Sequence, residues 1–172
     1  MDKRSLKVLE FDSIKNMLLD MTVTTLGKKY VENLYPLVDR EKIIYAQKQT
    51  SEAQKIIITR GNIPISAIGQ VSEYAKRASI EAILEPYQLL RVCDTLRICR
   101  KVKSFLRDSE NTPILQGLSE NITILKELEE EIENAIISEE EISDNASGEL
   151  RKIRRNIINT KEQVRQKLSS IV

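Results

Sequence analysis

The residues after Ser147 carry the feature that most restricts the fold, namely apolar side chains at heptad spacing. Ile153 begins one stripe, which fades at Thr160 and Lys167. A second stripe has four members, each seven positions from the next: Leu150, Ile157, Val164 and Ile171. Such spacing predicts a long helix that packs against a partner helix. No Gly, Asn or Pro follows its last turn, so we expect this chain to be a piece of a longer protein.

Helical spacing of apolar residues extends over nearly all of the 172 residues. The chain has only five Gly and four Pro, so we expect long uninterrupted helices. With 41% hydrophobic residues it can bury one core, and its length does not demand two independent domains. The predicted fold is all-α, with a multi-helix core over residues 1–146 and a long C-terminal helix over residues 147–172.

Capping residues and prolines place the other predicted helices, with Thr24 or Thr25, Asp39 and Pro86 at three of their starts. They cover residues 14–21, 24–34, 39–60, 71–78, 86–106, a short element from 113, and 125–136. We expect the first of these to bury its apolar stripe, and Gly61 to close the third as a left-handed cap. Residues 62–69 are expected to form a loop, with a short strand as the alternative. Asp144 or Ser147 is the expected N-cap of the final helix.

The net charge of +1 conceals a segregation of charge along the chain. Residues 126–148 hold one basic and nine acidic side chains, whereas residues 149–172 hold seven basic and two acidic ones. In one interpretation the acidic segment and the basic helix attract each other as neighbours. In the other, the basic side chains form a track for nucleic-acid phosphates, although no aromatic residue is interleaved with them. The candidate nucleic-acid residues are Arg151, Lys152, Arg154, Arg155, Lys161 and Arg165.

A second basic set lies on the outer face of the helix predicted over residues 86–106. Its members are Arg91, Arg97, Arg100, Lys101, Lys103 and Arg107. These side chains are suited to contact phosphate, but a solvated helix face is the commoner meaning of such a set. The charge pattern alone does not distinguish between the two interpretations.

The residue types present exclude most catalytic chemistry. The chain has no His, which rules out Ser/His and Cys/His nucleophilic pairs and His-ligated zinc within it. No Gly-rich turn precedes a Lys-Ser or Lys-Thr pair, so no phosphate-binding loop is predicted. The cluster Glu129, Glu130, Glu131 and Glu133 occupies neighbouring helical positions that point in different directions, and we assign no metal and no cofactor to this chain.

Neither a disulfide nor a membrane segment is expected. Cys93 and Cys99 are six positions apart on one helix, which places them on different faces, so we interpret both as reduced core thiols. No signal peptide and no run long enough to span a bilayer occurs. A cytoplasmic location, with no membrane partner, is the simplest expectation.

Several short landmarks together resemble a known family. They are Leu9-Glu10-Phe11, Thr25-Leu26-Gly27-Lys28, Leu34-Tyr35-Pro36, Thr50-Ser51-Glu52-Ala53, Gly61 with Pro64, and Asp144-Asn145-Ala146-Ser147 followed by Leu150, Ile153 and Arg154. In this order and spacing, across essentially the whole chain, they resemble the N-terminal region of type-two MutS proteins. The sequence departs from the family pattern in two connections. Gly69-Gln70 stands where a basic and then an acidic residue are expected, and Glu81-Ala82 stands where a glycine pair is expected.

The resemblance implies a helical core followed by the ascending arm of a lever helix at residues 147–172. In that family the lever rises to a clamp and returns to an ABC-type ATPase domain, which binds ATP and Mg, and a Smr nuclease domain follows. The resemblance thus implies a homodimeric ATPase that binds branched DNA and suppresses homologous recombination. Some members of the family are expected to act on collided ribosomes in ribosome rescue. None of the ATP-binding, rRNA-binding or nuclease motifs can be assigned to a residue of this chain.

Two functions of different class follow from these expectations. In the first, the chain is a core and lever module that couples an ATPase to a clamp around nucleic acid, and it has no catalytic activity of its own. Its partners are then the rest of the parent protein and, through that protein, DNA or the ribosome. In the alternative, the chain is a stand-alone helical module whose last helix binds a partner coiled coil or a second copy.

Overall fold

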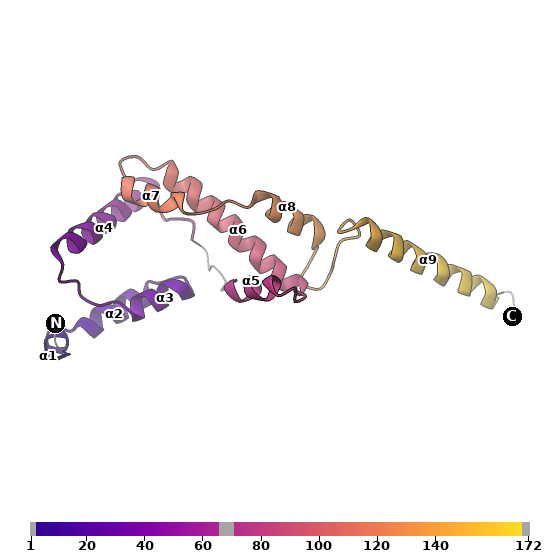
Figure 1. The fold of residues 1–172 in the computed structure, drawn as a ribbon, viewed down its shortest axis with the longest axis horizontal. Coiled ribbons are helices and arrows are strands. Elements are labelled where there is room, and N and C mark those ends of the chain that lie inside the picture. Colours follow the sequence, from indigo (N-terminus) through magenta and orange to yellow (C-terminus); the bar gives the residue numbers. More distant parts are fainter. Residues whose placement is uncertain (1–2, 66–70, 170–172) are drawn as a thin grey trace. The chain divides into compact units, whose positions relative to one another are not determined.

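A computed structural model describes residues 3–65 and 71–169 (Figure 1). Within these ranges every regular element is an α-helix, so the all-α prediction is confirmed. The helices are α1 (Lys3–Val8), α2 (Phe11–Asp20), α3 (Thr25–Glu32), α4 (Arg40–Arg60), α5 (Ser72–Ser79), α6 (Pro86–Arg107), α7 (Pro113–Glu120), α8 (Lys126–Ala135) and α9 (Gly148–Ser169). A single antiparallel bridge joins Ile136 to Ile142 in the described part.

Contacts divide the chain into two compact units. The first unit contains residues 1–72 and 94–124, and the second contains residues 73–93 and 125–172. Helix α6 contributes to both, because its residues up to Cys93 belong to the second unit and those from Asp94 belong to the first. Residues 1–146, which we expected to form the core, therefore contribute to both units.

Two helices of the first unit begin at the side-chain caps that the sequence predicts. The Thr24 hydroxyl accepts a hydrogen bond from the Gly27 N–H at 3.0 Å, at the start of α3. The Asp39 carboxylate accepts bonds from the N–H groups of Glu41 at 2.9 Å and Lys42 at 3.1 Å, at the start of α4. Each cap satisfies N–H groups that have no partner inside the helix.

The packed part of the first unit joins α4 to α6 and α7. Ile56 of α4 is only 1% exposed. One turn earlier, the Glu52 carboxylate accepts bonds from the N–H groups of Ile114 at 3.2 Å and Leu115 at 2.9 Å, at the start of α7. Figure 1 shows α4 and α7 side by side, and these two helices are in contact. A carboxylate at a helix N-terminus is favoured both by the N–H donors and by the helix dipole.

The prediction that residues 14–21 bury an apolar stripe is wrong. Met17 is 62% exposed and Met21 is 76% exposed, and α2 has no buried residue. The main contacts of α2 are with α1 and α3, which are helices of six and eight residues. Two helices this short cover only part of the stripe, and the remainder faces solvent.

Gly61 follows α4 as predicted, but with a different backbone conformation. Its φ is 82°, as expected for glycine, whereas its ψ of −166° is far from the left-handed helical value. The expected loop is without strand structure over residues 62–65, and its remaining positions, including Gly69 and Gln70, lie outside the described residues. Glu81, at one of the two positions where we expected a glycine pair, has a φ of 58°. Glycine would be less strained there.

The second unit packs α8 against the first half of α6. Cys93, Ile132 and Ile136 form its buried cluster, against which Leu89, Leu90, Val92 and Ala135 pack. Neither Cys93 nor Cys99 is part of a disulfide in the described residues, in agreement with the prediction of reduced thiols; Cys93 is buried and Cys99 is half-buried. The prediction of α8 is thus confirmed, and the apolar packing against α6 is what holds this glutamate-rich helix.

Side-chain bonds fix the start of α6 in the second unit. The Gln88 side-chain oxygen accepts a bond from the Glu85 N–H at 3.0 Å, which is half of a capping box. Arg77 of α5 donates to the Ile83 carbonyl at 3.0 Å and approaches the same Gln88 oxygen at 3.4 Å. Pro86 is the first helical residue, as predicted.

None of the helices in the described ranges combines the length and the apolar character needed to cross a membrane.

Candidate helix-docking site

A short folded turn positions the start of α9. The Ser143 N–H donates to the Ala135 carbonyl at 2.8 Å, next to the Ile136–Ile142 bridge, and this contact ties the turn to the end of α8. The Ser147 hydroxyl then accepts a bond from the Leu150 N–H at 3.0 Å. Ser147, rather than Asp144, is therefore the N-cap of α9.

Two of the predicted nucleic-acid residues bond to this turn. Arg151 donates to the side-chain oxygen of Asn145, and Arg154 pairs with the carboxylate of Asp144. Arg154 is half-buried, whereas the other predicted basic residues of α9 are exposed. The turn and the first two turns of α9 are therefore joined by charged and polar bonds as well as by the cap.

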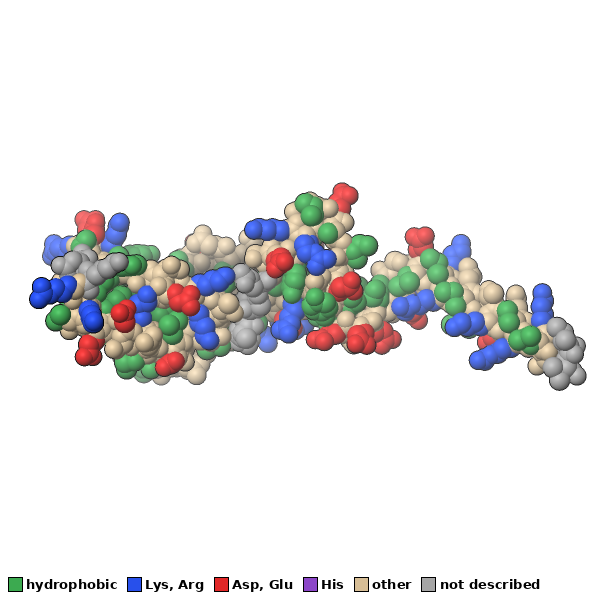
Figure 2. Space-filling model, turned by 90° about the horizontal axis from the view of Figure 1, so that it is seen from below, with side chains coloured by type: hydrophobic (Ala, Val, Ile, Leu, Met, Phe, Trp, Pro, Cys, Tyr) green, Lys and Arg blue, Asp and Glu red, His purple; other side chains and the backbone are tan. Residues whose placement is uncertain are grey.

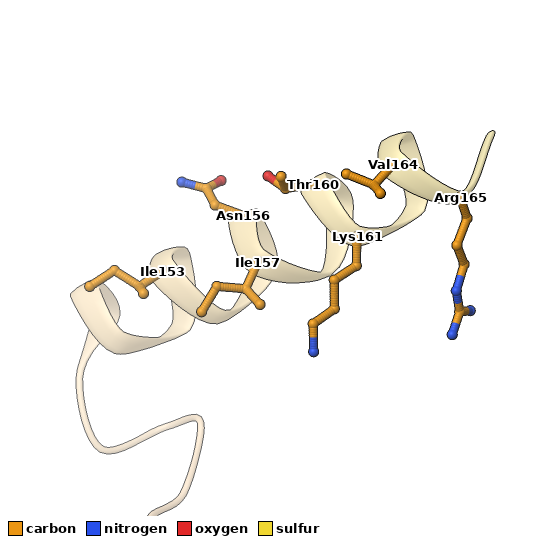
Figure 3. Close-up of a pocket in the computed structure, with 7 residues that line it drawn as sticks. All are labelled: Ile153, Asn156, Ile157, Thr160, Lys161, Val164 and Arg165. Atoms are coloured by element: carbon orange, nitrogen blue, oxygen red, sulfur yellow. The ribbon is translucent and has the colours of Figure 1, made fainter. Parts of the chain in front are cut away.

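The apolar face of α9 is open to solvent over the described length of the helix. Ile153 is 48% exposed, Ile157 is 49% exposed and Val164 is 51% exposed, and none of the described residues of α9 is buried. Their spacing of four and seven positions keeps them on one face, where Asn156 and Thr160 join them (Figure 3). We call Ile153, Ile157 and Val164 the seam of α9. Ile171, the last expected member of the stripe, lies outside the described residues.

Basic side chains border the seam. Lys161 and Arg165 line the same open groove as Ile157 and Val164, and Figure 3 shows both pointing to one side of the apolar row. Apolar and basic side chains also share the visible surface of α9 in Figure 2. Lys152 and Arg155 are exposed elsewhere on the helix. The binding of nucleic acid by Arg151, Lys152, Arg154, Arg155, Lys161 and Arg165 remains a prediction.

The arrangement is suited to helix docking. An apolar row with a basic border is the surface that a coiled-coil partner with acidic flanking positions would cover. Among the described residues no group of three His, Cys, Asp or Glu side chains is placed to hold a metal ion. No such group is formed on α8 by the neighbouring glutamates Glu129, Glu130, Glu131 and Glu133.

Sequence reasoning missed one cluster of the first unit. The guanidinium of Arg60, at the end of α4, lies 4.5 Å from the centre of the Phe105 ring on α6. It also donates to the Ser109 hydroxyl at 3.0 Å. The two helices are far apart in sequence, and no local pattern pairs their side chains. The one available signal was an aromatic residue, Phe105, among the basic side chains of α6.

No family model matches the chain. Similar proteins nevertheless exist, each carrying the name Endonuclease MutS2. That of Alkaliphilus oremlandii is 48% identical over 175 residues, which cover 100% of this chain and 22% of that protein. Those of Clostridioides difficile and Acetivibrio thermocellus are 43% and 39% identical, again over 100% of this chain and 22% of each relative. Over its whole length this chain is therefore the counterpart of one region of the MutS2 proteins, a region that makes up about a fifth of each relative.

Proposed function

We propose that this chain is a core and lever module of a MutS2 protein, in which α9 forms part of an arm between an ATPase domain and a clamp around nucleic acid. The observation that carries the proposal is the exposed seam on a helix whose start is firmly capped. Such a helix is fixed at one end and has an unused apolar face along its length. It is suited to pack against another helix of the same protein.

Length and burial both support a mechanical role. Helix α9 has 22 described residues, and a helix rises about 1.5 Å per residue, so it extends over about 33 Å. Burying an exposed Ile or Val side chain contributes roughly 1.5–3 kcal/mol, so a second helix laid on the seam would gain several such increments. Two packed helices resist bending and can transmit movement from one end to the other.

The chemistry of the whole protein would then lie in its other regions. ATP and Mg would be bound by the ATPase domain, and the relatives' name assigns them an endonuclease activity. The parent is proposed to act as a homodimer in the cytoplasm on branched DNA, on collided ribosomes, or on both. This chain would contribute shape and coupling, with no catalytic residue of its own.

The proposal is testable in a chimera in which this chain replaces the corresponding region of the A. oremlandii MutS2 protein. The double variant Ile157→Gln with Val164→Gln should retain basal ATP hydrolysis and lose the stimulation of that hydrolysis by branched DNA or ribosomes, because the arm no longer packs. Ile158→Gln is the matched control, since Ile158 lies about 120° around the helix from Val164. Equal stimulation in the seam variant and the control would contradict the coupling role.

The alternative function, a stand-alone interaction module, rests on the same exposed seam. It predicts that the isolated chain self-associates tightly through α9 and is indifferent to nucleic acid. Analytical ultracentrifugation distinguishes the two functions, because the lever proposal expects the isolated chain to be predominantly monomeric. Tight association that Ile157→Gln abolishes and Ile158→Gln leaves intact would favour the alternative.

A further inference from the structure

The first unit contains a basic hollow between the end of α4 and the second half of α6. Its volume is about 580 Å³. Five basic side chains line it, together with Phe105 and one carboxylate, that of Asp108; the basic residues are Arg60, Arg100, Lys101, Lys103 and Arg107. The basic side chains of the hollow come from two helices, α4 and α6. A merely solvated helix face would involve the side chains of one helix only. We call it the α4–α6 hollow.

Arg60 is held in place from several directions. Its guanidinium stacks on the Phe105 ring, with 4.5 Å between the guanidinium carbon and the ring centre. The Nη1 atom donates both to the Phe105 carbonyl and to the Ser109 hydroxyl. Ser109 is itself only 2% exposed and donates to the Phe105 carbonyl at 2.9 Å. A planar cation is thereby fixed at the wall of the hollow, and its Nε and Nη2 edge carries three further N–H groups.

Two other basic side chains are also positioned by the fold. The Lys103 ammonium donates to the Ile122 carbonyl at 2.7 Å, which holds it beside the hollow. Arg107 lies 3.2 Å from a carboxylate oxygen of Asp108, whose other oxygen accepts from Ser104 at 3.3 Å. One acidic group faces five basic ones, so the lining of the hollow carries a net positive charge, which attracts anions.

We propose that the α4–α6 hollow binds the phosphate groups of a nucleic-acid strand, with a base stacked on the Arg60 guanidinium. Arginine planes are common stacking surfaces for unpaired bases, and fixed cations at successive helical turns suit successive phosphates. An acidic peptide would use the charge but not the stacked plane. The proposal does not depend on the lever role of α9, because every residue of the hollow belongs to the first unit.

The experiment measures binding of a short, labelled, mixed-sequence single-stranded DNA to the 172-residue chain by fluorescence anisotropy. The double variant Lys101→Gln with Arg107→Gln should bind about tenfold more weakly, and its affinity should depend less steeply on salt between about 50 and about 200 mM. Lys28→Gln with Lys29→Gln, which removes the same charge from the exposed surface of α3, should bind within about twofold of the unchanged chain. Circular dichroism checks that all variants keep their helix content.

Two further arms decide the class of ligand. Arg60→Lys keeps the charge but removes the stacking plane, so it should weaken binding of the oligonucleotide and leave binding of tripolyphosphate unchanged. Equal losses in the hollow and α3 variants, or a loss confined to Arg155→Gln with Lys161→Gln on α9, would overturn the site. Polyglutamate bound as tightly as DNA, or an Arg60→Lys chain that binds DNA normally, would overturn the assignment to a nucleic-acid strand.

Discussion

Gly27 shows how one residue fixes a local structure. A Cβ atom at this position would lie 2.7 Å from the Thr22 methyl carbon and 2.9 Å from the hydroxyl oxygen of Thr24. Both distances are shorter than carbon atoms tolerate, and the Thr24 hydroxyl is the cap of α3. The resemblance to the family included Gly27 as a landmark, and the structure supplies a steric reason for it.

The same substitution at two glycines should therefore change stability in opposite directions. Gly27→Ala should lower the free energy of unfolding by about 1 kcal/mol, because the new methyl group clashes with the Thr22 methyl and displaces the Thr24 cap, and these losses exceed the gain in helix propensity. Gly117→Ala, in α7, should raise it by about 0.5–1 kcal/mol, because helical alanine is favoured over glycine and nothing lies within 4 Å of the added atom. Urea unfolding followed by circular dichroism measures both changes. A stabilising Gly27→Ala would contradict the steric account.

Glu52 makes a second residue-scale connection, from α4 to the N-terminus of α7. Glu52→Gln removes the charge and turns an amide N–H₂ group toward a backbone donor. We expect a loss of about 1.5–3 kcal/mol, the range for hydrogen bonds to charged groups. Glu120→Gln, at the exposed C-terminal end of α7, is the matched control and should change stability little. If the urea unfolding curves of the two variants coincide, the Glu52 bonds contribute nothing to the free energy of unfolding.

At the scale of elements, local signals were sufficient to predict most helices. Thr24, Asp39, Pro86 and Ser147 each mark a helix start that the structure confirms. Caps and prolines act within one turn, so the sequence near a helix end contains the information that determines it. The same information does not say which neighbour a helix meets. For that reason the stripe of α2 was wrongly expected to be buried, although its helical spacing is real.

The two candidate sites also differ in whether the local sequence could predict them. The seam of α9 was predictable because its members repeat along one helix. The α4–α6 hollow was not, since Arg60 and Phe105 meet only through the packing of two helices that are distant in sequence. The bonds of Arg151 and Arg154 to the preceding turn were missed as well, because side-chain pairing at a turn depends on its folded path.

The cap of α9 gives a prediction at the scale of one element. Ser147→Ala removes the acceptor for the Leu150 N–H and should cost about 1 kcal/mol at the start of the helix. Amide hydrogen exchange over residues 148–153 should become faster, while exchange in α6 stays unchanged, because the opening is local. Asn159→Ala is the control within α9 and should not accelerate exchange at the helix start. Unchanged exchange in Ser147→Ala would show that the cap is not what fixes this end.

At the scale of the whole molecule, both units leave part of their apolar surface exposed. The second unit buries Cys93, Ile132 and Ile136 between α6 and α8 and leaves the seam of α9 exposed. The first unit leaves most of α2 and much of α3 exposed in the same way. Exposed apolar faces of this extent are typical of surfaces that another part of a protein covers. The match to about a fifth of each relative's length agrees with that interpretation.

The central claim is that the seam of α9 is covered by another helix of a MutS2 protein. Amide hydrogen exchange over residues 150–168 tests it most directly, measured in the isolated chain and in the A. oremlandii chimera under identical conditions. Packing on the seam predicts exchange slower by at least about tenfold in the chimera, since a gain of about 1.4 kcal/mol in local stability already gives that factor. Equal exchange rates in the two proteins would contradict the claim.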